Sequence, residues 1–122
     1  MSYNWGPQYL VPSQVLKSYS GIVRLRETFD EDLLRKELKE LGFTGSILRI
    51  TNPWYYRKVN TDTWIEIGES DNRGENFAVT WDTTNVENGQ YQVMGLMHVF
   101  VRDGNKGIAI VRQNIVEVTV EN

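Results

Sequence analysis

Two alternating segments joined by a polar stretch constrain the fold of this chain more than any other feature. The first, Asn76 to Trp81, places Phe77, Val79 and Trp81 on one face. The second, Tyr91 to Val101, alternates in the same way, with one face formed by Tyr91, Val93, Met97, Val99 and Val101. Alternation with a period of two is typical of a β-strand that is half buried against a core. The chain is therefore predicted to fold around these two strands.

The polar stretch between them, DTTNVENG, is rich in residues that favour turns. Tyr91 follows Gly89 by two residues, which is the place of a tyrosine corner, where the ring enters the core and the hydroxyl bonds back to the backbone. The second strand is also apolar on its opposite face, through Met94, Leu96 and Phe100. We expect that face to be covered, either by the leucine stripe of a helix or by a dimer partner.

One amphipathic helix is predicted from Phe29 to Leu41. Thr28 and Glu31 have the spacing of a capping box, in which each side chain satisfies a backbone N–H at the start of the helix. The leucines at positions 33, 34, 38 and 41 form one stripe, and the charged residues form the solvent face. Gly42 is placed to end the helix in the left-handed conformation.

The rest of the chain is predicted to be rich in strands, with the helix inserted between the second and third. The expected strands are Tyr9–Leu16, Gly21–Glu27, Ser46–Thr51, Trp64–Gly68 and Ile108–Val120, with Trp54–Val59 continuing the third beyond a break at Pro53 and a hairpin turn over Gly104–Gly107. The expected fold is mainly β: a sandwich of about seven strands with one helix at about residues 29–41. Residues 1–8 are expected to be a flexible arm before a single domain at 9–122.

Length and composition exclude several classes of function. A chain of 122 residues is the size of one domain. A net charge of −3 argues against a general binder of nucleic acid, and the absence of cysteine excludes disulfides and thiolate chemistry. No apolar run approaches the roughly 18 residues of a membrane span, so no membrane insertion is expected. The N-terminus lacks the pattern of a signal peptide, which leaves two interpretations: a cytoplasmic protein, or a piece of a longer exported chain.

Three segments carry a resemblance to a known family: WDTTNVENGQYQVMG, VRDGNKG and the closing IVEVTVEN. Trp81 ends one strand, Asn88 and Gly89 turn, and Tyr91 starts the next strand. Together with Asp103–Gly104–Asn105 and the closing Val118, Val120 and Asn122, this pattern resembles bacterial immunoglobulin-like (fibronectin type III-like) β-sandwich domains. The chain departs from that family in a shortened turn and in the inserted helix. The resemblance implies an accessory module that acts as a non-catalytic spacer, stabiliser or adhesion unit.

Signs of catalysis are weak in this sequence, and we expect neither an enzyme nor a bound cofactor or metal. His98 is the sole histidine and alternates with apolar residues, so it is interpreted as structural; alone and without cysteine, it cannot complete the usual zinc sets. The motifs of nucleophile elbows, phosphate-binding loops and zinc proteases are absent. Carboxylate pairs such as Glu66 with Glu69 would need to converge in a pocket to act as acid and base.

The strongest candidate for a binding site is the aromatic segment NPWYYRK, from Asn52 to Lys58, with Trp64 close behind. Three consecutive aromatic residues in a strand cannot all face one core. Trp54, Tyr55, Tyr56 and Trp64 would stack on a sugar ring or dock a partner, while Arg57 and Lys58 would orient polar groups. The alternative is purely structural: Trp54 and Tyr56 pack under the helix while Tyr55 lies in the core.

These features favour a non-catalytic structural or protein-interaction module of a larger bacterial extracellular or surface protein. Its partner would be a neighbouring domain, another protein or a second copy, and the interface would involve Met94, Leu96 and Phe100. Structural roles are expected for Tyr91, Trp81 and Gly42. Two other readings stay open: a carbohydrate-binding module that uses exposed aromatics, and a small enzyme with a carboxylate site.

Overall fold

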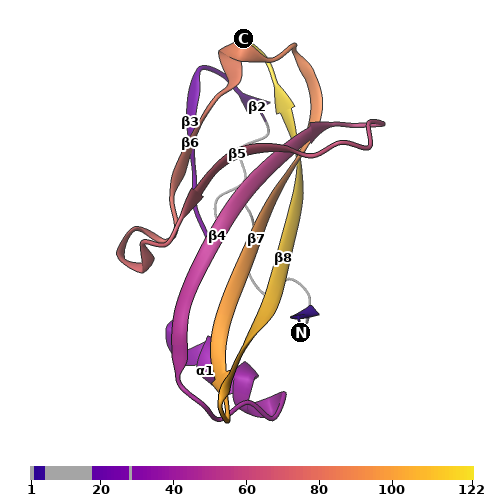
Figure 1. Cartoon of the computed structure of the whole chain (residues 1–122). Helices are drawn as coiled ribbons and strands as arrows, with labels where there is room; N and C mark the ends of the chain where they lie inside the picture. Colours follow the sequence, from indigo (N-terminus) through magenta and orange to yellow (C-terminus); the bar gives the residue numbers. More distant parts are fainter. Residues whose placement is uncertain (1, 5–17, 28) are drawn as a thin grey trace.

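The computed structural model describes residues 2–4, 18–27 and 29–122. The described part of the chain is mainly β with one α-helix (Figure 1). The strands are β1 (Ser2–Asn4), β2 (Ser18–Tyr19), β3 (Ile22–Leu25), β4 (Ile47–Lys58), β5 (Ile65–Ser70), β6 (Val79–Asp82), β7 (Gly89–Asp103) and β8 (Lys106–Val120), and the helix is α1 (Glu31–Glu40). Short 3₁₀ turns cover Arg73–Glu75 and Thr83–Asn85. The predicted class and the position of the helix are confirmed, and the predicted strand Tyr9–Leu16 lies outside the described residues.

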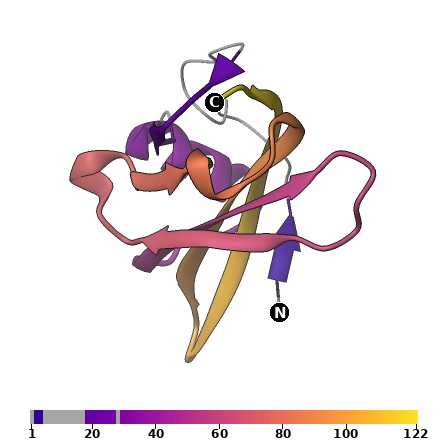
Figure 2. The same cartoon turned by 90° about the horizontal axis from the view of Figure 1, so that it is seen from above.

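The strands form two sheets of unequal size. The larger sheet has the order β1-β8-β7-β4-β5, with β2 also paired to β8, and the smaller sheet pairs β3 with β6. Both β1 and β2 run parallel to β8, whereas the other pairs are antiparallel. Ser2–Asn4 therefore form a strand within the segment that was predicted to be a flexible arm. The small sheet and α1 lie on the same side of the large sheet, here called its inner face; the opposite side is the outer face (Figure 2).

The inner face is buried in two halves. Over one half lies the small sheet, and the core there is formed by Tyr19, Leu25, Trp54, Trp81, Tyr91, Val93, Val118 and Val120. Over the other half lies the helix, whose Leu34 and Leu38 pack with Met97, Val99, Val101 and Ile110. The prediction that the helix covers Met94, Leu96 and Phe100 is wrong. The short strands β3 and β6 leave half of the inner face uncovered, and the helix fills that space.

The predicted end of the helix is confirmed, whereas its predicted N-terminal cap is not. The N-cap is Asp30, whose Oδ1 accepts a hydrogen bond from the Leu33 N–H at 3.2 Å, so the predicted capping box does not set the start; Thr28 is outside the described residues. At the other end Gly42 has φ +91°, and the Phe43 N–H donates to the Leu38 carbonyl at 2.9 Å. This is a Schellman ending, and it confirms the predicted left-handed conformation of Gly42.

Two strand boundaries differ from the predictions. The strand expected from Asn76 begins only at Val79, because Asn76 and Phe77 have positive φ values of 54° and 56° after the 3₁₀ turn. The predicted break at Pro53 is absent, and β4 runs through it. The register of β4 on β7 passes from Thr51 opposite His98 to Trp54 opposite Gly95. The register of β4 on β7 is thus the same on both sides of Pro53, and Pro53 pairs with Glu69 of β5.

Two polar contacts close the end of the molecule at the C-terminus. The Tyr91 hydroxyl donates to the Glu87 carbonyl at 2.6 Å, which confirms the tyrosine corner. The Asn122 side chain accepts from the Gly21 N–H at 2.9 Å and donates to the Thr83 carbonyl at 2.8 Å. Asn122 therefore ties the end of the large sheet to the small sheet, which gives the closing asparagine of the sequence pattern a structural role.

Candidate functional site

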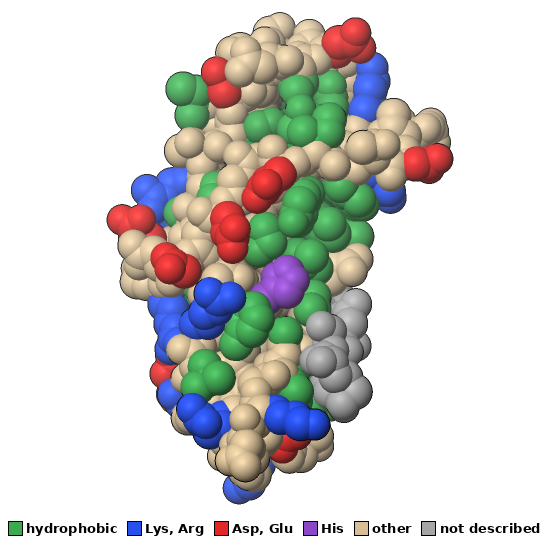
Figure 3. All heavy atoms as spheres, in the orientation of Figure 1, with side chains coloured by type: hydrophobic (Ala, Val, Ile, Leu, Met, Phe, Trp, Pro, Cys, Tyr) green, Lys and Arg blue, Asp and Glu red, His purple; other side chains and the backbone are tan. Residues whose placement is uncertain are grey.

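The outer face of the large sheet carries an apolar stripe along its middle. Strand β7 contributes Met94, Leu96 and Phe100, and the register sets Tyr55 of β4 and Ile115 of β8 on either side of Met94. Leu96 and Phe100 are half-buried, and Ile115 is 40% exposed. Figure 3 shows hydrophobic side chains gathered around the histidine on this face. The outer face thus brings together the residues predicted for an interface.

The predicted aromatic site is divided between the two faces of β4. Trp54 has no exposed surface, and its indole N–H donates to the Phe77 carbonyl at 2.9 Å. Tyr56 packs on Trp81, with ring centroids 5.1 Å apart. Both point to the inner face, as the structural alternative proposed, but they lie under the small sheet and not under the helix. Tyr55 belongs to the outer face, opposite Met94, and not to the core.

The cationic residues of the same segment also separate. The Arg57 Nε–H donates to Gln92 Oε1 at 2.7 Å, and the guanidinium lies 4.2 Å from the centroid of the Trp64 ring. Lys58 instead pairs with Glu87 at 2.9 Å, beside the tyrosine corner. Arg57 and Trp64 therefore form a stacked unit on the outer face, to which Lys58 does not belong.

Charged groups of opposite sign flank the two ends of the apolar stripe. On the edge strand β5, Glu66 lies opposite Tyr55 and Glu69 opposite Pro53, and both carboxylates are exposed. Burial, and then the charges of Glu66 and Glu69, raise the pKa of Tyr55. Toward the hairpin that joins β7 and β8, the exposed Arg49 places its guanidinium 4.4 Å from the centroid of the Phe100 ring. Glu66 and Glu69 therefore mark an acidic end of the stripe, where Arg57 also lies on the outer face, and Arg49 marks a basic end.

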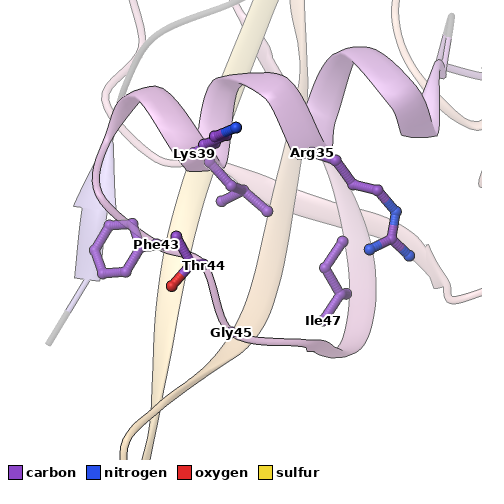
Figure 4. A pocket seen from close by; sticks show the side chains of 7 residues that line it. Arg35, Lys39, Phe43, Thr44, Gly45 and Ile47 are labelled. Carbon is purple, nitrogen blue, oxygen red and sulfur yellow. The ribbon is translucent and has the colours of Figure 1, made fainter.

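Two of the hollows that the described residues form lie away from this face. One, of about 280 Å³, opens between α1 and the start of β4; it is lined by Leu38 and by Arg35, Lys39, Phe43 and Ile47 among others (Figure 4). The other, of about 380 Å³, lies under the connection from β4 to β5 and is lined by Tyr56, Ile65, Val86 and Tyr91 among others. Neither lining contains a histidine or a pair of carboxylates. Among the described residues, no group of three or more acidic, histidine or cysteine side chains is placed to hold a metal ion.

A buried polar cluster lies on the inner face between the two halves of the core. The Glu27 carboxylate, 1% exposed, accepts a hydrogen bond from the Asn114 side chain at 3.1 Å. Arg112, also 1% exposed, forms an ion pair with Glu37 of the helix. Burial raises the pKa of Glu27 to about 7, although the hydrogen bond from Asn114 and the charge of Arg112 oppose the change. This cluster connects β3, the helix and β8 within the core.

This cluster was not predicted, although the alternation of the strands indicates that its residues face the core. Glu27 has the same parity as Val23 and Leu25, which face the core. In the same way Arg112 and Asn114 continue the buried row of β8, which includes Ile110 and Val118. A charged residue at a position that should be buried indicates a buried polar contact.

The chain was compared with protein-family models, with curated proteins and with solved structures, and none of the three comparisons gave a match. No helix in the described ranges is long and apolar enough to cross a membrane.

Proposed function

We propose that this chain is a non-catalytic protein-interaction module of immunoglobulin-like architecture that binds its partner through the outer face of the large sheet. The observation that carries this proposal is the apolar stripe of β7 on the outer face, where Leu96 and Phe100 are partly exposed beside Met94, which is 9% exposed, with charged groups at both ends. Apolar groups that stay accessible on one face, with a polar rim, are the usual composition of a protein interface. As with the family it resembles, a larger bacterial surface assembly is the proposed setting.

Support for the immunoglobulin-like part of the proposal comes from two contacts. The hydroxyl of Tyr91 bonds to the backbone of the preceding corner, as in the β-sandwich hallmark. The closing Asn122 joins the two sheets. The small sheet packs across the inner face of the large sheet over a shared aromatic core.

A protein fits the outer face better than a sugar does. A flat sugar-binding platform needs exposed aromatic faces. Trp54 is fully buried, Tyr56 packs on Trp81, and the guanidinium of Arg57 stacks on Trp64. The remaining aromatic side chain of this segment is Tyr55, which is half-exposed. Within the described residues, no other ring and no guanidinium stacks on it.

The outer face is also better suited to binding a protein than to catalysing a reaction. Glu66 and Glu69 are exposed on an edge strand, outside the linings of the two hollows described above. General acid–base catalysis by two carboxylates needs environments that separate their pKa values, and open solvent does not supply them. Burial of apolar side chains, by contrast, favours association without requiring them to converge in a pocket.

Site-specific photo-crosslinking tests this function. A photoreactive amino acid would replace Leu96 on the outer face or, as the control, Ile22, which is 72% exposed on the small sheet. After irradiation in an extract of the source cells, we expect protein adducts from position 96 and few from position 22. If position 96 gives no protein adducts above the control, the proposal is wrong. A soluble glycan that blocks labelling at position 96 would instead favour the carbohydrate-binding alternative.

A further inference from the structure

We propose that the partner on the outer face is a second copy of this chain, packed face to face and antiparallel about a two-fold axis that crosses β7 at Met97. This inference rests on the proposed function and names the partner for that same surface. Two independent features of the outer face, its apolar stripe and its charges, indicate the same axis.

The apolar stripe is symmetric about Met97. Along β7 the outward side chains nearest to Met97 are Leu96 and His98, and the next large apolar ones are Met94 and Phe100, three residues to either side. A two-fold axis across the strands at Met97 places Met94 of one copy over Phe100 of the other. Leu96 then lies against the His98 ring, which stacks on Phe100 with centroids 6.4 Å apart. The stripe thus meets an apolar stripe along its whole length.

The charges reverse sign about the same point. Glu66 is aligned with Met94 through Tyr55, while Arg49 is aligned with Phe100. The two-fold axis at Met97 therefore carries Glu66 of one copy toward Arg49 of the other, twice in each dimer. A parallel face-to-face arrangement would instead place acidic end over acidic end.

A second pair of charges is related by the same axis, in a row that also contains Arg57 of β4. Glu117 of β8 is opposite Gln92, and Arg102 projects from the same face as Gln92, further along β7. Gln92 and Arg102 are each five residues from Met97. The rotation that brings Glu66 toward Arg49 therefore also brings Glu117 toward Arg102.

None of these four charged groups forms an ion pair among the described residues, although the guanidinium of Arg49 lies over the Phe100 ring. The ion pairs among the described residues involve Glu31, Glu37 and Glu87 as acids, and neither Arg49 nor Arg102 takes part in them. All four side chains are exposed. Opposite charges that are separated on one chain and aligned between two copies favour a second copy as the occupant, because a symmetric interface must be complementary to itself.

Charge reversal with mixing tests the arrangement. In Arg49→Glu alone, each dimer would hold two Glu–Glu contacts, and in Glu66→Arg alone two Arg–Arg contacts. We expect each variant alone to dimerise about tenfold more weakly, or worse, than the unaltered chain in sedimentation equilibrium. An equimolar mixture of the two variants should regain the dimer, because both contacts then pair opposite charges. Arg49 and Glu66 lie in different rows of one chain, so this rescue requires two copies.

The matched control is Arg24→Glu, the same charge change on an exposed residue of the small sheet. Its dimerisation should equal that of the unaltered chain. If the unaltered chain is a monomer at all concentrations, the inference is wrong. A dimer whose affinity ignores both reversals, or a mixture without rescue, overturns the proposed axis.

A second experiment does not depend on the folding of charge variants. The chain has no cysteine, so His98→Cys introduces a single thiol close to the proposed axis. We expect mild oxidation or a short bifunctional thiol reagent to give a covalent dimer quickly, while Ile22→Cys, exposed on the small sheet, should react slowly. Equal rates at the two positions would contradict the axis.

The results separate the two proposals. Adducts from position 96 to a different protein, with a monomeric chain, would leave the interaction module standing and refute the second copy. No protein adduct at position 96 and no dimer would refute both.

Discussion

Replacing Glu27 by glutamine tests the energetic role of the buried polar cluster. Burial raises the pKa of Glu27 from 4.5 to about 7 in the folded chain. Because the folded state holds the proton more tightly than the unfolded state, this group's contribution to stability is fully present below pH 4.5 and is lost as the pH rises through 7. Each pH unit between the two pKa values corresponds to about 1.4 kcal/mol. Ionised Glu27 therefore costs the folded state up to about 3 kcal/mol above pH 8.

Glutamine keeps the shape and the acceptor for Asn114 without the ionisation. We therefore expect Glu27→Gln to be more stable than the unaltered chain at pH 8 and to lose most of that advantage at pH 5. The assay is urea unfolding followed by tryptophan fluorescence at both pH values, at a concentration where the chain is monomeric. The control Glu121→Gln removes an exposed carboxylate, which water solvates in both states. An equal difference between Glu27→Gln and the unaltered chain at pH 5 and pH 8 would refute the reasoning.

Three further substitutions test packing and turns by the same unfolding assay. Tyr91→Phe removes the 2.6 Å hydrogen bond to the Glu87 carbonyl, so we expect the free energy of unfolding to fall by about 1 kcal/mol. Gly45→Ala would place a Cβ 2.0 Å from the Arg102 carbonyl oxygen; backbone must move, and we expect a loss of about 2 kcal/mol or more. Trp54→Phe removes a buried indole N–H donor and leaves a cavity, which should cost about 2–4 kcal/mol.

Two of these changes, Tyr91→Phe and Gly45→Ala, have a partner variant. Tyr55→Phe alters a half-buried outer-face tyrosine whose hydroxyl makes no hydrogen bond within the described part of the chain, and it should cost less than Tyr91→Phe. Gly74→Ala places a Cβ 3.3 Å from one side-chain atom of Asn72, which can move, and should be milder than Gly45→Ala. A loss at Gly74 as large as that at Gly45 would show that the contact with Arg102 is not the cause.

Several elements could be predicted from the sequence because their causes are local. The alternation of β7 depends on residues two positions apart, and the helix end depends on Leu38, Gly42 and Phe43, all within two turns. The tyrosine corner joins Tyr91 to a carbonyl only four residues earlier. Two local predictions failed because a neighbouring residue or turn was favoured instead. Asp30 caps the helix in place of the predicted capping box, and β6 begins later than predicted because a 3₁₀ turn precedes it.

By itself, the sequence determined which residues of β7 share a face, where the helix stops and how Tyr91 closes its corner, because these depend on short-range geometry. Only the tertiary structure decided which face each element covers. It placed the helix on the inner face, separated Trp54 from Tyr55, and aligned Glu66 with one end of the stripe and Arg49 with the other. Strand register and layer assignment depend on contacts between residues far apart in the chain, and a single sequence carries no local signal for them.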